Sequence, residues 1–137
     1  IDRQDLRSEL KVFREVMSVM EREKNLSFCI FPEGTRSKKE NGFELLPFHP
    51  GSFKPAMKMS LPIVPVCLYL TDRILDQSLH YHRYPVQISF LKPLYPSEYE
   101  DLSTAQVADL VHSRMKEELD VLKSRDMDYV LKLNGRK

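Results

Sequence analysis

Residues 26–37 read Leu-Ser-Phe-Cys-Ile-Phe-Pro-Glu-Gly-Thr-Arg-Ser and carry the clearest structural signal of the chain. Residues 26–31 form a short apolar run, and Pro32 ends it because proline lacks the N–H that a central strand requires. In open α/β sheets, ligands bind where a strand ends and the following loop begins. We therefore predict a buried strand over 26–31 and a candidate binding loop from Phe31 to Ser37.

Helical and extended patterns alternate on both sides of this stretch. Apolar residues at helical spacing predict a helix over 6–24 and another that opens at Ser103, which forms a capping-box pattern with the glutamine three residues later. A short helix is expected over 51–59, and apolar runs at 61–70 and 86–91 predict two further buried strands. The alternation predicts an α/β fold with a largely parallel sheet flanked by helices, in a single domain.

The composition is that of a soluble globular protein. Of the 137 residues, 42% are hydrophobic and 30% charged, and the net charge of +1 excludes a general nucleic-acid-binding surface, which needs strongly basic character. The longest apolar run, 61–70, is too short to span a bilayer. Cys29 and Cys67 lie in apolar runs and are predicted to be small core residues. The scattered histidines predict no metal site.

The loop after Pro32 carries groups that suit an anion. Gly34 permits a backbone turn that a side chain would block, Thr35 offers a hydroxyl, and Arg36 offers a planar fork that matches phosphate. From Gly34 to Ser60 there are five basic and two acidic residues in a nearly neutral chain. The residues alone fit either a phosphate-binding loop or an ordinary solvated loop.

The residues Phe-Pro-Glu-Gly-Thr-Arg-Ser at 31–37 resemble the third signature block of the glycerolipid acyltransferase family, the lysophosphatidate (1-acylglycerol-3-phosphate) acyltransferases. Three further segments are similar in order and spacing. Ile-Asp-Arg at 1–3 resembles the end of the second block, Gly-Ser-Phe at 51–53 the start of the following helix, and 61–66 the fourth block. The resemblance implies that residues 1–137 are a partial acyltransferase domain, the C-terminal part of a glycerol-phosphate acyltransferase-like fold. That part would hold the second to fourth blocks and a C-terminal strand and helix.

The resemblance implies the transfer of a fatty acyl group from an acyl thioester to the free hydroxyl of 1-acylglycerol 3-phosphate, which gives phosphatidate in phospholipid biosynthesis. Acyl-CoA or acyl-ACP would be the co-substrate, with no cofactor and no metal. The residues implied to hold the acceptor are Arg3, Glu33, Gly34, Thr35 and Arg36. The two arginines would clamp the phosphate, since paired guanidinium–phosphate bonds are strong and directional. Glu33 would either hold the substrate or pair with an arginine, and Pro62 and Pro65 would shape the acyl-donor side.

The first block of the family, a His and an Asp separated by four residues, is absent from these 137 residues. In the family this His acts as the general base on the acceptor hydroxyl, and the Asp orients it. The fifth positions after His49, His80, His82 and His112 hold Lys54, Pro85, Gln87 and Glu117. We therefore expect no catalytic residue in this chain, which we interpret as part of a longer protein and expect to be inactive alone.

The resemblance also implies attachment to the cytoplasmic face of a membrane through an N-terminal part that this sequence lacks. The chain itself is expected to be soluble, with uncovered apolar surface that favours self-association. Two other functions stay open. A catalytically inactive module that binds anions or lipids would keep the same loop. A phosphatase would need a set of metal-binding carboxylates or a cysteine nucleophile, and the sequence has neither near the loop.

Overall fold

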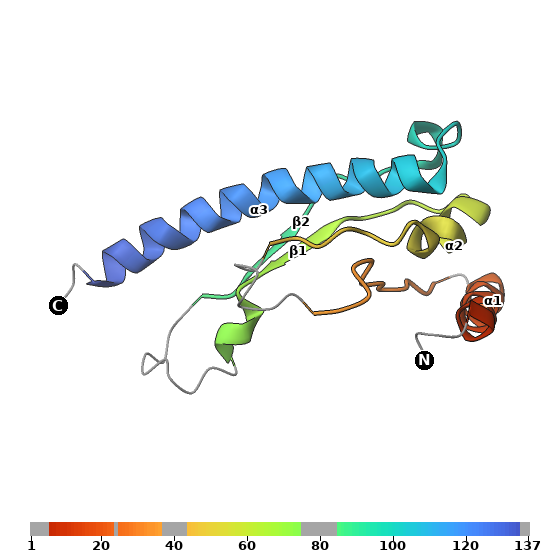
Figure 1. Cartoon of the computed structure of the whole chain (residues 1–137), viewed down its shortest axis with the longest axis horizontal. Coiled ribbons are helices and arrows are strands. Elements are labelled where there is room, and N and C mark those ends of the chain that lie inside the picture. Colours follow the sequence, from red (N-terminus) through yellow and green to blue (C-terminus); the bar gives the residue numbers. More distant parts are fainter. Residues whose placement is uncertain (1–5, 24, 37–43, 75–84, 135–137) are drawn as a thin grey trace. The chain divides into compact units, whose positions relative to one another are not determined.

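The computed structural model describes residues 6–23, 25–36, 44–74 and 85–134. In chain order its elements are α1 (Leu6–Arg22), the 3₁₀ helix η2 (Pro50–Phe53), α2 (Lys54–Lys58), β1 (Val66–Tyr69), η3 (Thr71–Ile74), β2 (Gln87–Phe90), η4 (Pro96–Glu98) and α3 (Thr104–Asn134) (Figure 1). The chain divides into two compact units, unit 1 with residues 1–62 and 95–108, and unit 2 with residues 63–94 and 109–137. Each unit combines two stretches of chain, so no linker in the sequence marks the division.

Unit 1 contains α1, η2, α2 and η4. The helix predicted over 6–24 is confirmed as α1, and among its described side chains Phe13 and Met20 are half-buried. The short helix expected over 51–59 is confirmed as η2 followed by α2, and it buries Phe53. The predicted capping box before α3 is confirmed as well. The Ser103 N–H donates to Gln106 Oε1 at 2.9 Å, and the Gln106 N–H donates to Ser103 Oγ at 3.3 Å.

A buried tyrosine fastens the end of α2 to the turn after η4. Tyr99 is 2% exposed, and its hydroxyl donates a hydrogen bond to the carbonyl oxygen of Leu61, 2.7 Å away. Burial raises the pKa of Tyr99, so the hydroxyl keeps the proton that this hydrogen bond needs. The bond therefore fixes the position of the backbone at Leu61, where the chain leaves α2 and the segment 61–66 begins.

Unit 2 is a two-stranded sheet packed on α3, which runs alongside both strands (Figure 1). β1 and β2 pair antiparallel, with Cys67 opposite Ser89. Side chains alternate along a strand, and this pair faces α3, where the Ser89 hydroxyl donates to a Glu118 carboxylate oxygen at 2.7 Å. The opposite face leaves Ile88 58% and Phe90 74% exposed. The most deeply buried apolar side chains of this unit are Cys67, Leu94, Val111 and Leu122.

The α and β content matches the prediction, but the described strands do not form a parallel sheet. β1 and β2 pair antiparallel, and no parallel pair occurs within the described ranges. The apolar runs at 61–70 and 86–91 do contain these strands, as predicted. An apolar run indicates that a strand is covered, but it carries no information about the direction of its partner.

The prediction of a buried strand over 26–31 is wrong for this structure. The segment is extended, but it pairs with no strand among the described residues. All of its side chains are exposed, with Leu26 at 45% and Phe31 at 67%. Cys29 is therefore exposed, whereas Cys67, predicted to be a core residue in the same way, is 1% exposed. Burial of an extended run depends on neighbouring strands that cover it, and the run itself does not supply them.

A bidentate ion pair connects η3 to α3 in unit 2. Arg73 Nη1 lies 2.6 Å from Asp126 Oδ1, and Nη2 lies 2.8 Å from Oδ2. Asp126 is 6% exposed, so its charge relies on the guanidinium for compensation. The pKa of the nearby Tyr69 hydroxyl is raised, mainly by burial and to a smaller extent by the charge of Asp126. The hydroxyl therefore stays neutral beside the pair.

We predict that removal of one partner destabilises this unit more than removal of both. Arg73→Met leaves the Asp126 carboxylate buried without compensation, which should lower the free energy of unfolding by about 3 kcal/mol. The double variant Arg73→Met/Asp126→Leu should recover much of that loss, because no charge stays buried. Urea unfolding followed by circular dichroism measures both effects, with the exposed Arg125→Met as control. A double variant less stable than Arg73→Met would contradict this account.

Candidate functional site

The predicted binding loop is a tight turn at the end of the extended segment. The Gly34 N–H donates to the carbonyl oxygen of Phe31 at 3.0 Å, which closes a four-residue turn with Pro32 at its second position. Gly34 has φ of +64°, in the left-handed region that glycine adopts without steric cost. Thr35 and Arg36 follow the turn, and both are exposed. The turn therefore presents a hydroxyl and a guanidinium to solvent, next to a backbone without a side chain.

Two hydrogen bonds hold this turn against the segment that precedes η2. The Leu46 N–H donates to Glu33 Oε2 at 2.9 Å, and the His49 N–H donates to the carbonyl oxygen of Pro32 at 2.8 Å. The Ser52 N–H in turn donates to the His49 carbonyl at 3.0 Å, so the second segment runs directly into η2. One Glu33 oxygen is thus bound by the backbone, a contact that the sequence did not predict, and Glu33 has no arginine partner among the described residues.

The side chain of His49 lies against the backbone of Gly34. A Cβ atom placed on Gly34 would lie 3.0 Å from His49 Cδ2 and 3.1 Å from Nε2, closer than carbon atoms normally approach. The neighbouring Phe48 ring packs near the buried Phe53 ring, with 6.3 Å between centroids, and thereby anchors the segment that carries His49. The glycine therefore suits this position in two ways, because it adopts the backbone angle without strain and because a Cβ there would force the imidazole to shift.

The structure brings four of the predicted acceptor residues together on this one turn, namely Glu33, Gly34, Thr35 and Arg36. The fifth, Arg3, lies outside the described residues, as do Ser37 and the two lysines after it. Of the residues expected on the acyl-donor side, Pro62 is exposed, whereas Pro65 is buried next to β1. The carbonyl oxygen of Pro65 accepts the Leu91 N–H at 3.0 Å, which indicates a structural contribution.

The buried thiol of Cys67 and the possible metal ligands of the described residues offer no alternative site. The pKa of the Cys67 thiol is raised to about 11, mainly by burial and to a smaller extent by the charge of Glu118. The thiol is therefore no nucleophile at neutral pH. No group of three His, Cys, Asp or Glu side chains suited to a metal ion occurs in the described ranges. None of the described helices is long and apolar enough to cross a membrane.

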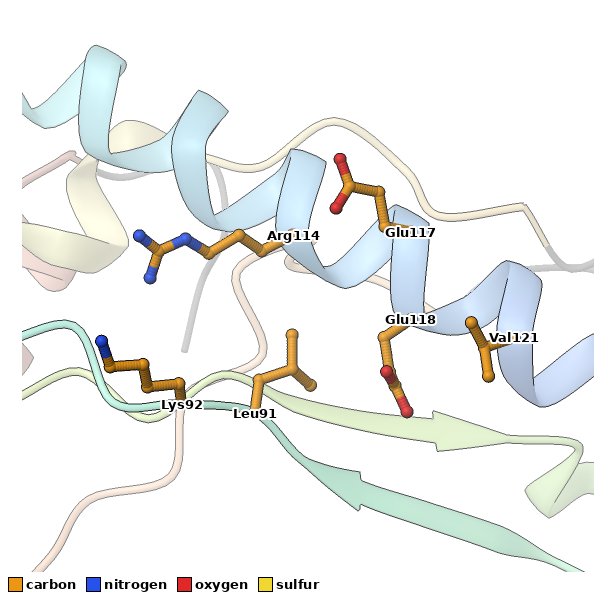
Figure 2. A pocket seen from close by; sticks show the side chains of 6 residues that line it. All are labelled: Leu91, Lys92, Arg114, Glu117, Glu118 and Val121. Atoms are coloured by element: carbon orange, nitrogen blue, oxygen red, sulfur yellow. The ribbon is translucent and has the colours of Figure 1, made fainter.

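Unit 2 also has an open hollow of about 520 Å³ between α3 and the segment after β2 (Figure 2). The side chains of Lys92 and Arg114 extend toward one end of it, whereas Glu118 points toward the strands, where the Ser89 hydroxyl binds it. Its other lining residues are Leu91, Glu117 and Val121. This lining contains no nucleophile with an adjacent base, so the turn at Gly34 is the better candidate for the functional site.

We predict that Gly34→Ala disturbs this site and that Gly51→Ala does not. An alanine at Gly34 must adopt a positive φ, which costs about 1–2 kcal/mol, and its Cβ must displace His49. At Gly51 a Cβ meets no atom within 4 Å, which makes this substitution the matched control. Amide hydrogen exchange at His49 should accelerate in Gly34→Ala, because its bond to Pro32 weakens. Unchanged exchange of the His49 amide in both variants would show that its hydrogen bond to Pro32 does not depend on the glycine.

The turn lies within the part of the chain that matches a known protein family. Residues 1–69 match the sequence model of the family described as Acyltransferase, and this segment contains the whole turn. A protein of Cocos nucifera named 1-acyl-sn-glycerol-3-phosphate acyltransferase is 32% identical over 114 residues, which are 82% of this chain and 36% of the relative. Proteins of the same name from Escherichia coli and Limnanthes douglasii are 32% and 34% identical over 72% of this chain, and 38% and 34% of their own lengths.

The chain thus spans little more than a third of the length of these curated relatives. No solved structure matches it significantly. The family match nevertheless covers 69 of the 137 residues, and it includes Phe31 to Arg36 with the turn geometry described above. On these grounds the chain belongs to the Acyltransferase family.

Proposed function

We propose that the natural protein containing this chain transfers a fatty acyl group from an acyl thioester to the free hydroxyl of 1-acylglycerol 3-phosphate and forms phosphatidate. The observation that carries the proposal is the glycine turn that presents Thr35 and Arg36 to solvent within the segment matched to the Acyltransferase family. The names of the relatives support lysophosphatidate as the acceptor. Acyl-CoA or acyl-ACP would supply the acyl group, without a metal or cofactor.

In this reaction the acceptor hydroxyl oxygen attacks the thioester carbonyl carbon, the C–S bond breaks, and an ester C–O bond forms. A general base takes the hydroxyl proton, and the departing sulfur leaves as a thiol once it has gained a proton. These 137 residues contain no His and Asp separated by four residues, so we assign the base to a part of the natural protein outside this sequence. The present chain would bind and orient the acceptor.

The roles of the turn residues follow from their exposure and hydrogen bonds. The Arg36 guanidinium would form paired bonds with the acceptor phosphate, and Thr35 would add a hydroxyl donor. Gly34 would let the phosphate approach the backbone, while Glu33 holds the turn through the Leu46 N–H. Arg3 would be a second phosphate clamp.

The proposed fold of the natural protein has a largely parallel sheet flanked by helices. The exposed apolar side chains of residues 26–31 are compatible with contacts to further parts of that protein, because exposed apolar surface of this kind marks interaction sites. Pro62 and Pro65 would shape the acyl-donor side of that protein. We also propose that it attaches to the cytoplasmic face of a membrane, and that this chain alone self-associates through its uncovered surface.

A catalytically inactive module that binds anions or lipids is the second candidate. The observation that favours it is the lack of a His/Asp pair within these 137 residues. Both candidates predict phosphate binding at the turn, and only the first predicts acyl transfer by the natural protein.

We predict that Arg36→Ala in the natural protein weakens acceptor binding far more than donor binding. Loss of one charge-assisted contact, about 1.5–3 kcal/mol, should raise the KM for lysophosphatidate roughly 10- to 100-fold. Steady-state kinetics with each substrate varied separately measures this, and Arg125→Ala on α3 is the control for loss of an exposed arginine. An unchanged KM for the acceptor would remove Arg36 from the site.

We predict in addition that the 137-residue chain alone does not turn over, although the natural protein does. General-base assistance contributes typically about 10²–10⁴-fold, and the residue that we expect to provide it is not in this sequence. Release of thiol from an acyl thioester in the presence of lysophosphatidate measures both proteins in parallel. Comparable turnover by both would place a catalytic base within these 137 residues.

A further inference from the structure

We propose that His49 is a further phosphate-contacting residue of the acceptor site, where its imidazole N–H binds the phosphate monoester alongside Arg36. The inference rests on the proposed function, which places the acceptor phosphate at the turn. The resemblance of residues 31–37 to the acyltransferase block assigns no role to this residue. What assigns it is the packing of the histidine ring against the turn.

The position of His49 is set by bonds on both sides of it. Its N–H donates to the carbonyl oxygen of Pro32 at 2.8 Å, and its carbonyl oxygen accepts the Ser52 N–H at 3.0 Å. The first bond joins it to the turn, and the second joins it to η2. The backbone of His49 is thus held at the turn before any ligand arrives, which reduces the ordering that binding requires.

The imidazole itself lies against the backbone of the turn. Its Cδ2–Nε2 edge is 3.0–3.1 Å from the position that a Cβ on Gly34 would take. Thr35 and Arg36 follow at once in the sequence, and both are exposed, as is His49. A phosphate bound at the Gly34 backbone by Arg36 would therefore have the histidine ring within reach.

The chemistry of the ring suits this ligand. An imidazole has at least one N–H donor in either protonation state, and a phosphate monoester offers several strong acceptor oxygens. Thr35, Arg36 and His49 carry a hydroxyl, a guanidinium and an imidazole, each of which can donate to a phosphate oxygen. Glu33, the carboxylate of the turn, is held by the Leu46 N–H. The phosphate would therefore meet N–H donors from two segments of the chain.

Two other roles for His49 make different predictions. A ring that merely packs on Gly34 would be replaceable by another flat ring of similar size. A general base would affect turnover with every acceptor alike. A phosphate contact instead affects only acceptors that carry a phosphate, and it survives replacement by another side chain with an N–H donor.

The test uses the natural protein and two acceptors, 1-acylglycerol 3-phosphate and the phosphate-free 1-acylglycerol. His49→Phe keeps a flat ring against Gly34 but removes the donors, and His49→Gln restores one. The quantity compared is the kcat/KM for 1-acylglycerol 3-phosphate divided by the kcat/KM for 1-acylglycerol. We expect His49→Phe to lower this ratio about tenfold, and His49→Gln to keep it within about threefold of the wild-type value. Lys123→Met, which removes an exposed cation from α3, should leave the ratio unchanged.

An unchanged ratio in His49→Phe, together with a lowered ratio in Arg36→Ala, would overturn the role of His49 and leave the proposed function intact. An equal loss of kcat with both acceptors would assign the ring to proton transfer and overturn the phosphate contact. A wild-type protein that transfers no acyl group would overturn both proposals. Should His49→Phe not fold, glycerol 3-phosphate can be titrated into wild-type protein labelled with ¹⁵N-histidine. A shift of the His49 ring signal supports the contact, and its absence overturns it.

Discussion

The hydrogen bonds between Glu33 and Leu46 and between Pro32 and His49 are the constraint on which the candidate site depends. An exposed turn of four residues has few apolar contacts to hold it, so its shape relies on such bonds to a second segment. Both bonds use backbone N–H groups of that segment. The side chains of Thr35 and Arg36 therefore take no part in holding the turn against it. A turn held in this way presents its polar groups in one arrangement, which lowers the entropy lost on binding.

Gly34 connects the local and the long-range parts of this arrangement. Its positive φ is a local requirement of the turn, whereas its missing side chain makes room for an imidazole fifteen residues further along. The second segment in turn stays in place because Phe48 packs near the buried Phe53. The site of unit 1 is therefore supported by a small aromatic contact behind it rather than by a sheet.

Unit 2 is stabilised in a different way, through contacts between its strands and α3. On the buried face of the sheet, the Ser89 hydroxyl donates to Glu118 and the Gln87 side-chain amide donates to the Leu122 carbonyl oxygen. Near the end of β1, Arg73 compensates the charge of Asp126. The opposite face, with Ile88 and Phe90, is apolar and exposed. Exposed apolar side chains thus occur on β2 as on residues 26–31, which is compatible with the larger sheet that we propose for the natural protein.

Features that depend on residues close together in the chain could be predicted from the amino-acid sequence. Periodic apolar residues predicted α1, turn chemistry predicted the bend at Pro32 and Gly34, and the spacing of Ser103 and Gln106 predicted the start of α3. The resemblance of residues 31–37 to an acyltransferase block pointed to four residues of the candidate site, and because they are consecutive, one turn places them together.

Contacts between groups that are far apart in the sequence became visible only in the folded structure. The Glu33–Leu46 bond spans 13 positions and the Arg73–Asp126 pair 53, and no local period encodes either of them. The antiparallel direction of β1 and β2 and the exposure of residues 26–31 likewise depend on which segments become neighbours, since an apolar run looks the same beside any partner. His49 was singled out for the same reason only by its packing on Gly34, because its place in the sequence resembles that of any loop histidine.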